Sequence, residues 1–271
     1  MNRKRKTKII IYFIFIFLLV ITISGIFLPE KLLEADFKSK NLKPSLSHLF
    51  GTDWMGRDMF FRTLKGLSIS ILIGLLASSI SAVIAGIIGV MSGTLPKWVD
   101  NTVLFLIDLF MGIPHILLLI LISFATGRGI KGIIIGVSIT HWTGLARVIR
   151  AETLQIKNEF YIKTAKNFGK SNLYIMRHHI MPHIIPQFIV GLILLFPHAI
   201  LHEASITFLG FGLSPEDPAI GIILSESMKY LSSGMWWLAF FPGLSLVFVV
   251  ILFDKLGENI KRLMDPYSSQ E

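Results

Sequence analysis

An uncharged run from Gly66 to Pro96 constrains the fold more than any other feature of the sequence. A helix over this run is long enough to cross a bilayer core of roughly 30 Å. Apolar runs recur along the chain, and hydrophobic residues make up 53% of its 271 residues. A water-soluble core does not need this much apolar sequence. We therefore expect an integral membrane protein.

Six apolar segments are candidates for membrane helices. They lie at about residues 9–29, 67–91, 103–124, 132–146, 184–209 and 236–253. The first is longer than the roughly 7–15 apolar residues of a signal peptide, and no A-x-A cleavage pattern follows it. We interpret it as an uncleaved helix. The sequence thus predicts an all-α, polytopic protein with six transmembrane helices.

Small residues recur at every fourth position of the second segment, in two sets. One set is Ser78, Ala82 and Gly86, and the other is Ala77, Ser81, Ala85 and Gly89. Such a ridge lets the backbone of another helix approach closely. We expect this helix to pack inside a bundle.

The formal charge of +9 could indicate nucleic-acid binding, but the basic residues flank apolar runs, which is typical of membrane orientation signals. We therefore expect membrane lipid and no nucleic acid as a partner. With six spans, both termini lie on the same side of the membrane. Lys and Arg are more frequent in the loops on that side than in the loops on the other side, so we expect both termini and the segment 147–183 in the cytoplasm. The chain has no cysteine, which excludes disulfides and thiolate metal sites.

A polar segment before the second span contains HLFGTDWMGRD, from His48 to Asp58. Thr52 or Asp53 can cap the helix that follows. Arg57 has a carboxylate on either side, at Asp53 and Asp58. We expect a capped interfacial helix with local ion pairs.

The third segment is interrupted by Asp108 and Pro114. A carboxylate at membrane depth usually faces a protein interior or a water-filled path. Asp108 is therefore either a pathway-lining acid or an interfacial, paired aspartate, and we favour the second interpretation.

Two local patterns resemble a nucleotide-binding and a zinc-binding motif, but each lacks a residue that its motif requires. Gly169-Lys170-Ser171 looks like the end of a P-loop, but position 164 is Thr where that motif needs its first glycine. His198 and His202 are spaced as in zinc-binding helices, with Glu203 adjacent, but the residue after the first histidine is Ala199 and not glutamate.

We expect these histidines to pack within the bundle, while contact with a transported metal or chelate stays open as an alternative. No catalytic set can be assembled from the sequence, and we expect neither a cofactor nor a resident metal.

The polar, basic segment from Asn158 to Pro182, called the coupling segment below, lies between two spans. Some of its side chains are small and would allow close approach, and others are aromatic and would anchor a partner. The small ones are Thr164, Ala165 and Gly169, and the aromatic ones are Phe160, Tyr161 and Phe168. Pro182 is expected to break the helix where the chain returns to the bilayer. The sequence predicts a docking element for a separate motor protein.

An ordered set of motifs carries a family resemblance. The motifs are HLFGTDWMGRD at 48–58, WVD at 98–100 with Asp108 and Pro114, WTGLARVIR at 142–150, EASITFLGFG at 203–212, FPG at 241–243 and LMDP at 263–266. With these, the chain resembles the inner-membrane permease subunits of ATP-binding cassette importers of the dipeptide/oligopeptide/nickel group, on the C side of the pair. The coupling segment resembles the EAA loop of that family, with Lys163 where a glutamate is expected.

The resemblance implies a type I permease fold, with an anchor helix and extracellular loop at 1–65 and a permease core at 66–271. It implies three kinds of protein partner: a homologous permease, one or two cytoplasmic ATPases and an extracellular solute-binding protein. The ATPase-coupling residues would be Glu159, Phe160, Tyr161, Thr164, Ala165, Phe168, Gly169 and Pro182. Pathway candidates are Asp108, His198, His202 and Glu203.

The chain itself would hydrolyse nothing, and its cargo would be a di- or oligopeptide, nickel or a metal chelate. Two alternatives are an intramembrane metalloenzyme and a membrane scaffold that does not transport.

Overall fold

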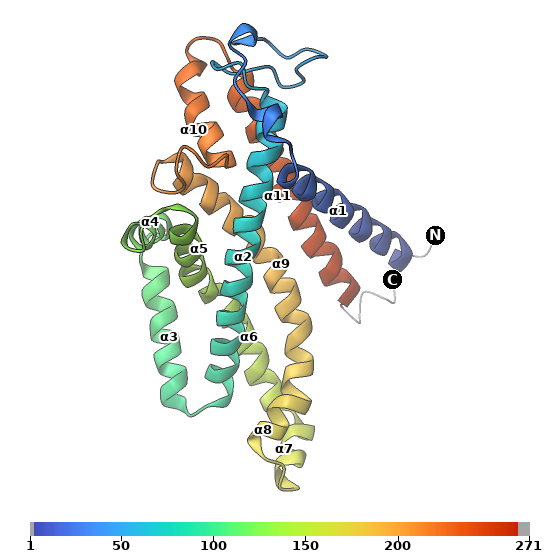
Figure 1. Ribbon diagram of the computed structural model, residues 1–271. Coiled ribbons are helices and arrows are strands. Elements are labelled where there is room, and N and C mark those ends of the chain that lie inside the picture. Colours follow the sequence, from blue (N-terminus) through green and yellow to red (C-terminus); the bar gives the residue numbers. More distant parts are fainter. Residues whose placement is uncertain (1–2, 265–271) are drawn as a thin grey trace.

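The computed structural model describes residues 3–264, and the Asp265-Pro266 end of the last motif lies outside them. Within this part of the chain the fold is helical, and the one β pairing is an isolated bridge between Thr52 and Asp58. The α-helices are α1 (Arg3–Ile26), α2 (Met59–Thr94), α3 (Lys97–Gly112), α4 (His115–Ala125), α5 (Gly129–Thr140), α6 (Trp142–Lys157), α7 (Phe160–Asn167), α8 (Asn172–Ile175), α9 (Met181–Phe208), α10 (Ile220–Leu231) and α11 (Trp237–Met264). They form an elongated bundle (Figure 1).

Helix α2 is the central element, and its start differs from the prediction. Asp58 is the N-cap residue, and its carboxylate accepts hydrogen bonds from the backbone N–H groups of Phe60 and Phe61. Thr52 or Asp53 was expected to cap this helix, but both residues lie too far upstream of its first turn. The Asp53 carboxylate instead accepts from the backbone N–H groups of Met55 and Arg57, which closes the preceding turn.

The predicted ridge of small residues on α2 packs against two other helices. A Cβ added at Gly89 would lie 2.9 Å from the Ile149 side chain of α6, and one added at Gly86 would lie 3.3 Å from the Phe188 side chain of α9. Neighbouring members of the ridge, such as Ala77 and Ala85, are fully buried. The ridge therefore lets α6 and α9 contact α2 on different sides.

Between residues 3 and 264, five helices are long and apolar enough to cross a membrane, and a bent pair makes up to six. The bent pair is α3 and α4, which meet at Pro114 with a bend of 97°. The third segment is thus not one straight helix, because proline lacks the N–H that would continue the hydrogen-bond ladder. Helix α10 lies between the fifth and sixth apolar segments, where no helix was predicted, and it packs against α9 and α11.

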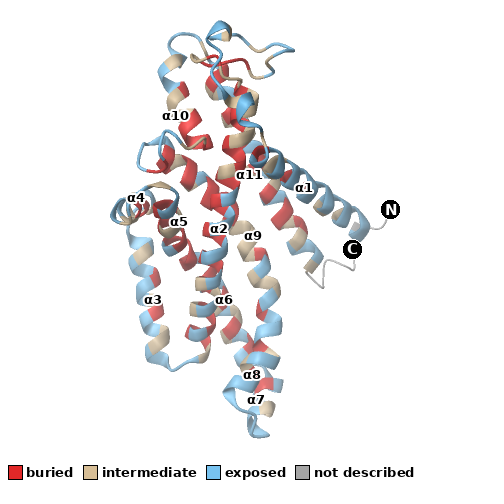
Figure 2. Cartoon of the chain, viewed as in Figure 1, coloured by how far each residue is buried: buried red, intermediate tan, exposed pale blue. Residues whose placement is uncertain are grey.

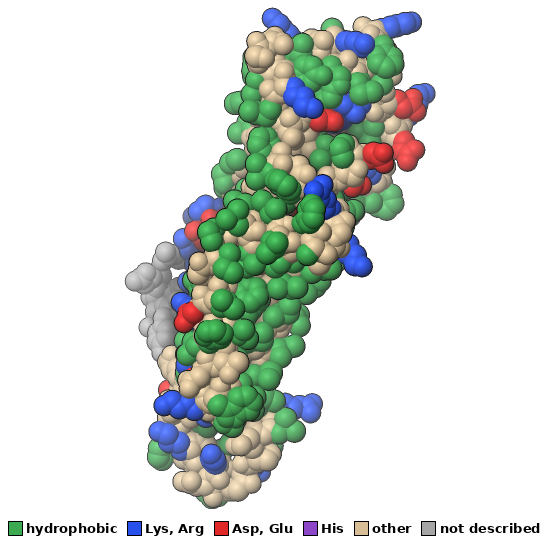
Figure 3. All heavy atoms as spheres, turned by 90° about the vertical axis from the view of Figure 1, so that its left-hand side faces the viewer, with side chains coloured by type: hydrophobic (Ala, Val, Ile, Leu, Met, Phe, Trp, Pro, Cys, Tyr) green, Lys and Arg blue, Asp and Glu red, His purple; other side chains and the backbone are tan. Residues whose placement is uncertain are grey.

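Buried side chains gather along α2, α5, α6 and α9, whereas α1, α3 and the tip at α7 are largely exposed (Figure 2). Much of this exposed surface is apolar. Hydrophobic side chains cover most of the middle of one long face, and Lys and Arg gather at its lower tip (Figure 3). A bilayer or a partner subunit is needed to cover such a surface.

Candidate functional site

The coupling segment folds into a compact tip at one end of the bundle, formed by α7, α8 and the start of the helix that leads into α9 (Figure 1). Helix α6 ends at Lys157, and the Asn158 side chain donates to the backbone carbonyl of Leu154 in its last turn. Glu159 is the N-cap residue of α7, without a side-chain capping bond. The Glu159 carboxylate is therefore not used in capping.

Helix α7 is attached to the bundle by a single buried side chain. Ile162 is 4% exposed and packs in the same apolar cluster as Ile156, Ile175 and Ile180. Phe160 and Phe168 are 83% and 80% exposed. Two large aromatic side chains are thus held in the open at the tip of the molecule, which is unfavourable unless a partner covers them.

The predicted small residues do different things. Ala165 is half-buried and packs against the apolar cluster, while the Thr164 hydroxyl donates to the backbone carbonyl of Phe160. Gly169 has a φ of +75°, and no atom within 4 Å would contact an added Cβ. Its contribution within this chain is the left-handed turn that ends α7, which glycine adopts without strain.

Tyr161 lies on the same helix and faces the histidines of the following turn, with its ring centroid 5.9 Å from that of His179. Burial, and to a smaller extent the Glu159 carboxylate, raise the pKa of the Tyr161 hydroxyl above its usual value. A tyrosine hydroxyl is protonated at neutral pH even without such a shift, so this one can donate a hydrogen bond.

Pro182 does not break the helix, contrary to the prediction. The chain is helical from Asn172 to Phe208, and a π-helical turn, Met176–Ile180, directly precedes α9. In this turn the backbone N–H of Met181 donates to the carbonyl of Met176, five residues back. A wider turn accommodates a residue that has no N–H to donate, so the helix continues through the proline.

An ion pair and a side-chain hydrogen bond brace the helices behind the tip. Arg150 of α6 makes two hydrogen bonds to Asp100 of α3, at 2.5 and 2.7 Å. The Lys157 ammonium donates to the backbone carbonyl of Gly93 at the end of α2. Helices α2, α3 and α6 are thus tied together at the base of the coupling segment.

The four pathway candidates are not brought together. Asp108 is 71% exposed and pairs with Arg147 at 2.9 Å. The carboxylate of Glu203 is fully buried, and its Oε1 atom accepts from the Thr207 hydroxyl. His198 is exposed, whereas His202 contacts His141.

Sequence reasoning missed His115 and His141 as partners of His202. The three histidines are far apart in the chain. Two of them lie at breaks between helices, because His115 begins α4 and His141 separates α5 from α6. A polar residue at each of two breaks in apolar sequence was the available signal.

A second missed cluster braces the opposite end of the bundle. Asp53 is fully buried, and its carboxylate accepts from both Arg57 and Arg62 at 2.7 Å. Arg62 also donates to Glu226 of α10 at 2.9 Å. Sequence reasoning expected only the local pairs around Arg57, because Glu226 is distant in the chain.

Comparisons with known proteins agree with this architecture. The model of the family described as "Binding-protein-dependent transport system inner membrane component" matches residues 85–266. The dipeptide transport system permease protein DppC of Bacillus subtilis (strain 168) is 34% identical over 265 residues, which cover 97% of this chain and 83% of that protein. The oligopeptide transport system permease protein OppC of the same organism is 31% identical over 252 residues, covering 91% and 82%.

Among solved structures, an inward-facing conformation of the MetNI methionine ABC transporter matches with a TM-score of 0.63. The match covers 75% of this chain and 96% of that chain, at 20% identity. At that identity the likeness concerns the fold.

Proposed function

The chain belongs to the family of inner membrane components of binding-protein-dependent transport systems, and on that premise we propose that it is the permease subunit through which an ATP-driven importer moves dipeptides or oligopeptides. It is not an enzyme: family members are transport subunits, and ATP hydrolysis belongs to separate subunits. The relatives named for dipeptide and oligopeptide transport favour peptides over nickel or a metal chelate as cargo.

The observation that carries this proposal is the exposed aromatic tip of the coupling segment. Phe160 begins a short helix whose only buried residue is Ile162, and Phe168 is the C-cap residue of the same helix. Aromatic side chains that enter a pocket of a partner are the usual anchors of protein interfaces. The tip therefore suits a cytoplasmic ATPase, whose movement on ATP binding would be transmitted to α6 and α9.

The exposed apolar helices support a second partner, a homologous permease that would complete the pathway. The end of the bundle opposite the tip carries the Asp53 network and α10, and would face the solute-binding protein. We propose that the tip, the start of α1 and the end of α11 all lie on the cytoplasmic side of the membrane, as the distribution of Lys and Arg among the loops suggests.

Uptake by a strain that lacks the chromosomal gene tests the proposal. We expect the wild-type chain to restore uptake of a labelled dipeptide or oligopeptide, and the Phe168→Asp variant to fail although it is present in the membrane. Phe37→Asp is the matched control, because Phe37 is also an exposed aromatic residue but lies on the outer loop. The Phe37→Asp variant should still associate with the ATPase.

The same strain separates the competing cargoes. Restored uptake of nickel or chelated nickel, without peptide uptake, would replace peptide by metal as the cargo. Absence of any uptake, together with no co-purified ATPase, would contradict the importer assignment and favour a membrane scaffold.

A further inference from the structure

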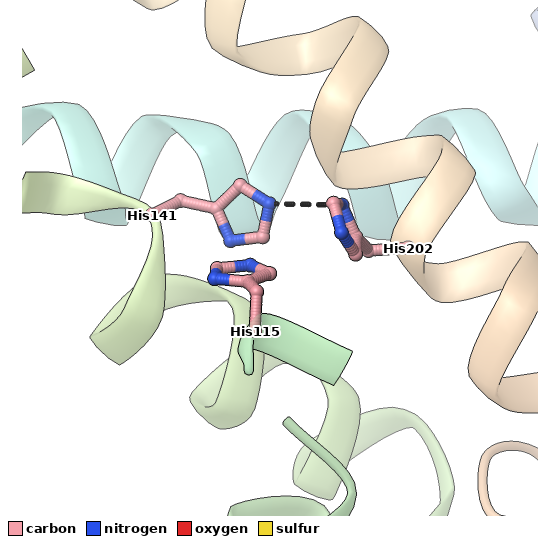
Figure 4. A group of neighbouring side chains, drawn as sticks. All are labelled: His115, His141 and His202. Carbon is pink, nitrogen blue, oxygen red and sulfur yellow. Dashed lines mark hydrogen bonds between the residues drawn. The ribbon is translucent and has the colours of Figure 1, made fainter. Parts of the chain in front are cut away.

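Three histidine rings that are distant in sequence meet inside the bundle. His115 comes from the start of α4, His141 from the junction of α5 and α6, and His202 from α9 (Figure 4). The ring centroids of His115 and His141 are 4.6 Å apart, as are those of His115 and His202. Each residue can offer one ring nitrogen, and these nitrogens all lie within 4.8 Å of one another.

Hydrogen bonds to backbone carbonyls fix the proton positions on two of the rings. The Nδ1 atom of His141 lies 3.1 Å from the carbonyl oxygen of Val137, and the Nδ1 atom of His202 lies 2.8 Å from that of His198. Because a carbonyl can only accept, both Nδ1 atoms carry the hydrogen and donate it. Each Nε2 atom therefore keeps its lone pair, which is how protein scaffolds prepare histidines as metal ligands.

The third ring has a nitrogen with no partner. The Nε2 atom of His115 is buried and makes no hydrogen bond to the described residues. A buried polar atom without a partner is costly, and it calls for a bound water or ion. In Figure 4 the His115 ring lies against both of the other rings.

The spacing suits a first-row transition metal. Zinc binds imidazole nitrogens at about 2.0–2.1 Å, so two nitrogens in a tetrahedral site are about 3.3 Å apart. The closest nitrogens, His141 Nε2 and His202 Nδ1, are 3.3 Å apart, but the Nδ1 atom of His202 carries the hydrogen that it donates to the His198 carbonyl. The rings must therefore rotate until the Nε2 atom of His202 also faces the cluster before the three lone pairs can meet at one ion.

A pocket of about 470 Å³ adjoins the cluster, and His115 and Thr140 are among the residues that line it. The pocket offers an approach for an ion and space for a further ligand. Three protein ligands leave such a position open for water or for a donor group of the cargo.

None of the three histidines belongs to a motif of the family resemblance, although each directly adjoins one. His115 follows Pro114, His141 precedes Trp142, and His202 precedes Glu203. The motifs account for the neighbouring residues and leave the three imidazoles unexplained.

We propose that His115, His141 and His202 form a binding site for a divalent transition-metal ion, such as Zn²⁺, Co²⁺ or Ni²⁺, within the membrane part of this permease. Neutral imidazole nitrogens favour these ions over Mg²⁺ and Ca²⁺, which prefer oxygen ligands. The site would bind its ion whether or not the transported cargo is a peptide.

Cobalt titration of the purified, detergent-solubilised transporter tests this proposal. The protein should carry a tag without histidines, and bound metal should first be removed with a chelator. We expect visible Co²⁺ absorption bands that saturate at about one ion per chain and are abolished by excess Zn²⁺. No saturable absorption in the wild-type protein would overturn the proposal.

Single substitutions locate the site. His115→Ala, His141→Gln and His202→Ala should each weaken Co²⁺ binding at least about tenfold. His198→Ala is the matched control, because His198 is exposed and lies one turn from His202 on the same helix. Wild-type binding in both His115→Ala and His202→Ala, or an equal loss in His198→Ala, would contradict the assignment; gel filtration of each variant shows that it is folded.

Discussion

The two ends of the bundle are held together in different ways. At the end that carries α10, which faces outward in the proposed orientation and is called the outer end below, Arg62 bridges the buried Asp53 and Glu226, and Trp54 stacks on Tyr230 with ring centroids 4.5 Å apart. At the opposite end, α7 is attached through Ile162 and leaves its aromatic residues in the open. Most charges of the outer end are paired within the chain, with the Nη2 atom of Arg57 left without a hydrogen bond to the described residues, whereas Phe160 and Phe168 of the coupling tip stay exposed.

The largest expected loss of stability comes from breaking the outer network. Asp53→Ala would leave Arg57 and Arg62 without their shared buried carboxylate, and we expect it to destabilise the fold by about 3–5 kcal/mol. Unfolding of the detergent-solubilised protein measures this. Glu258→Ala removes an exposed pair with Lys255 and should change nothing measurable. Equal midpoints for the two variants would show that the outer end is not braced as described.

The next largest effect is expected from weakening the attachment of α7 to the bundle. Ile162→Ala removes its one buried side chain and should cost about 2 kcal/mol locally, so the α7 amides should exchange roughly thirty-fold faster with deuterium. Hydrogen exchange followed by mass spectrometry measures this. The neighbouring Phe160→Ala is the control and should leave exchange unchanged in the isolated permease. Unchanged exchange in Ile162→Ala would mean that α7 is held by other contacts.

Two ion pairs near the coupling end give a smaller and graded effect. Asp100 and Arg150 are about one fifth exposed and make two hydrogen bonds, so Asp100→Asn should cost about 1–3 kcal/mol. Asp108 pairs with Arg147 in the open, so Asp108→Asn should cost less than about 1 kcal/mol. Chemical unfolding compares the two. A larger loss for Asp108→Asn would indicate that this carboxylate is buried in the assembled transporter.

Local sequence patterns predicted much of this fold because the local rules are strong. Uncharged apolar runs identified the membrane helices, and the four-residue spacing of small side chains identified the face of α2 that packs on α6. The aromatic residues of the coupling segment were also evident, because they stand in a polar and basic stretch. Helix α10 was missed, because its short amphipathic sequence follows a loop rich in proline and acid, SPEDP at residues 214–218.

Contacts between distant residues could not be predicted from the sequence. Arg62 and Glu226 are 164 positions apart, and His141 and His202 are 61 apart. No local pattern indicates which of many polar residues in a helical bundle will meet. The prediction that Pro182 breaks the helix was wrong for another reason. A π-helical turn, which leaves no sequence signature here, lets the helix continue through the proline.

The central claim is that the coupling tip is completed by an ATPase subunit, and its affinity for that subunit tests the claim most directly. We expect Phe160→Asp and Phe168→Asp to weaken ATPase binding by at least about thirty-fold, as loss of an interface anchor of about 2 kcal/mol or more implies, while permease stability stays within about 0.5 kcal/mol of wild type. Binding of the purified ATPase to the permease in nanodiscs gives both affinities. Wild-type affinity in both variants would contradict the claim.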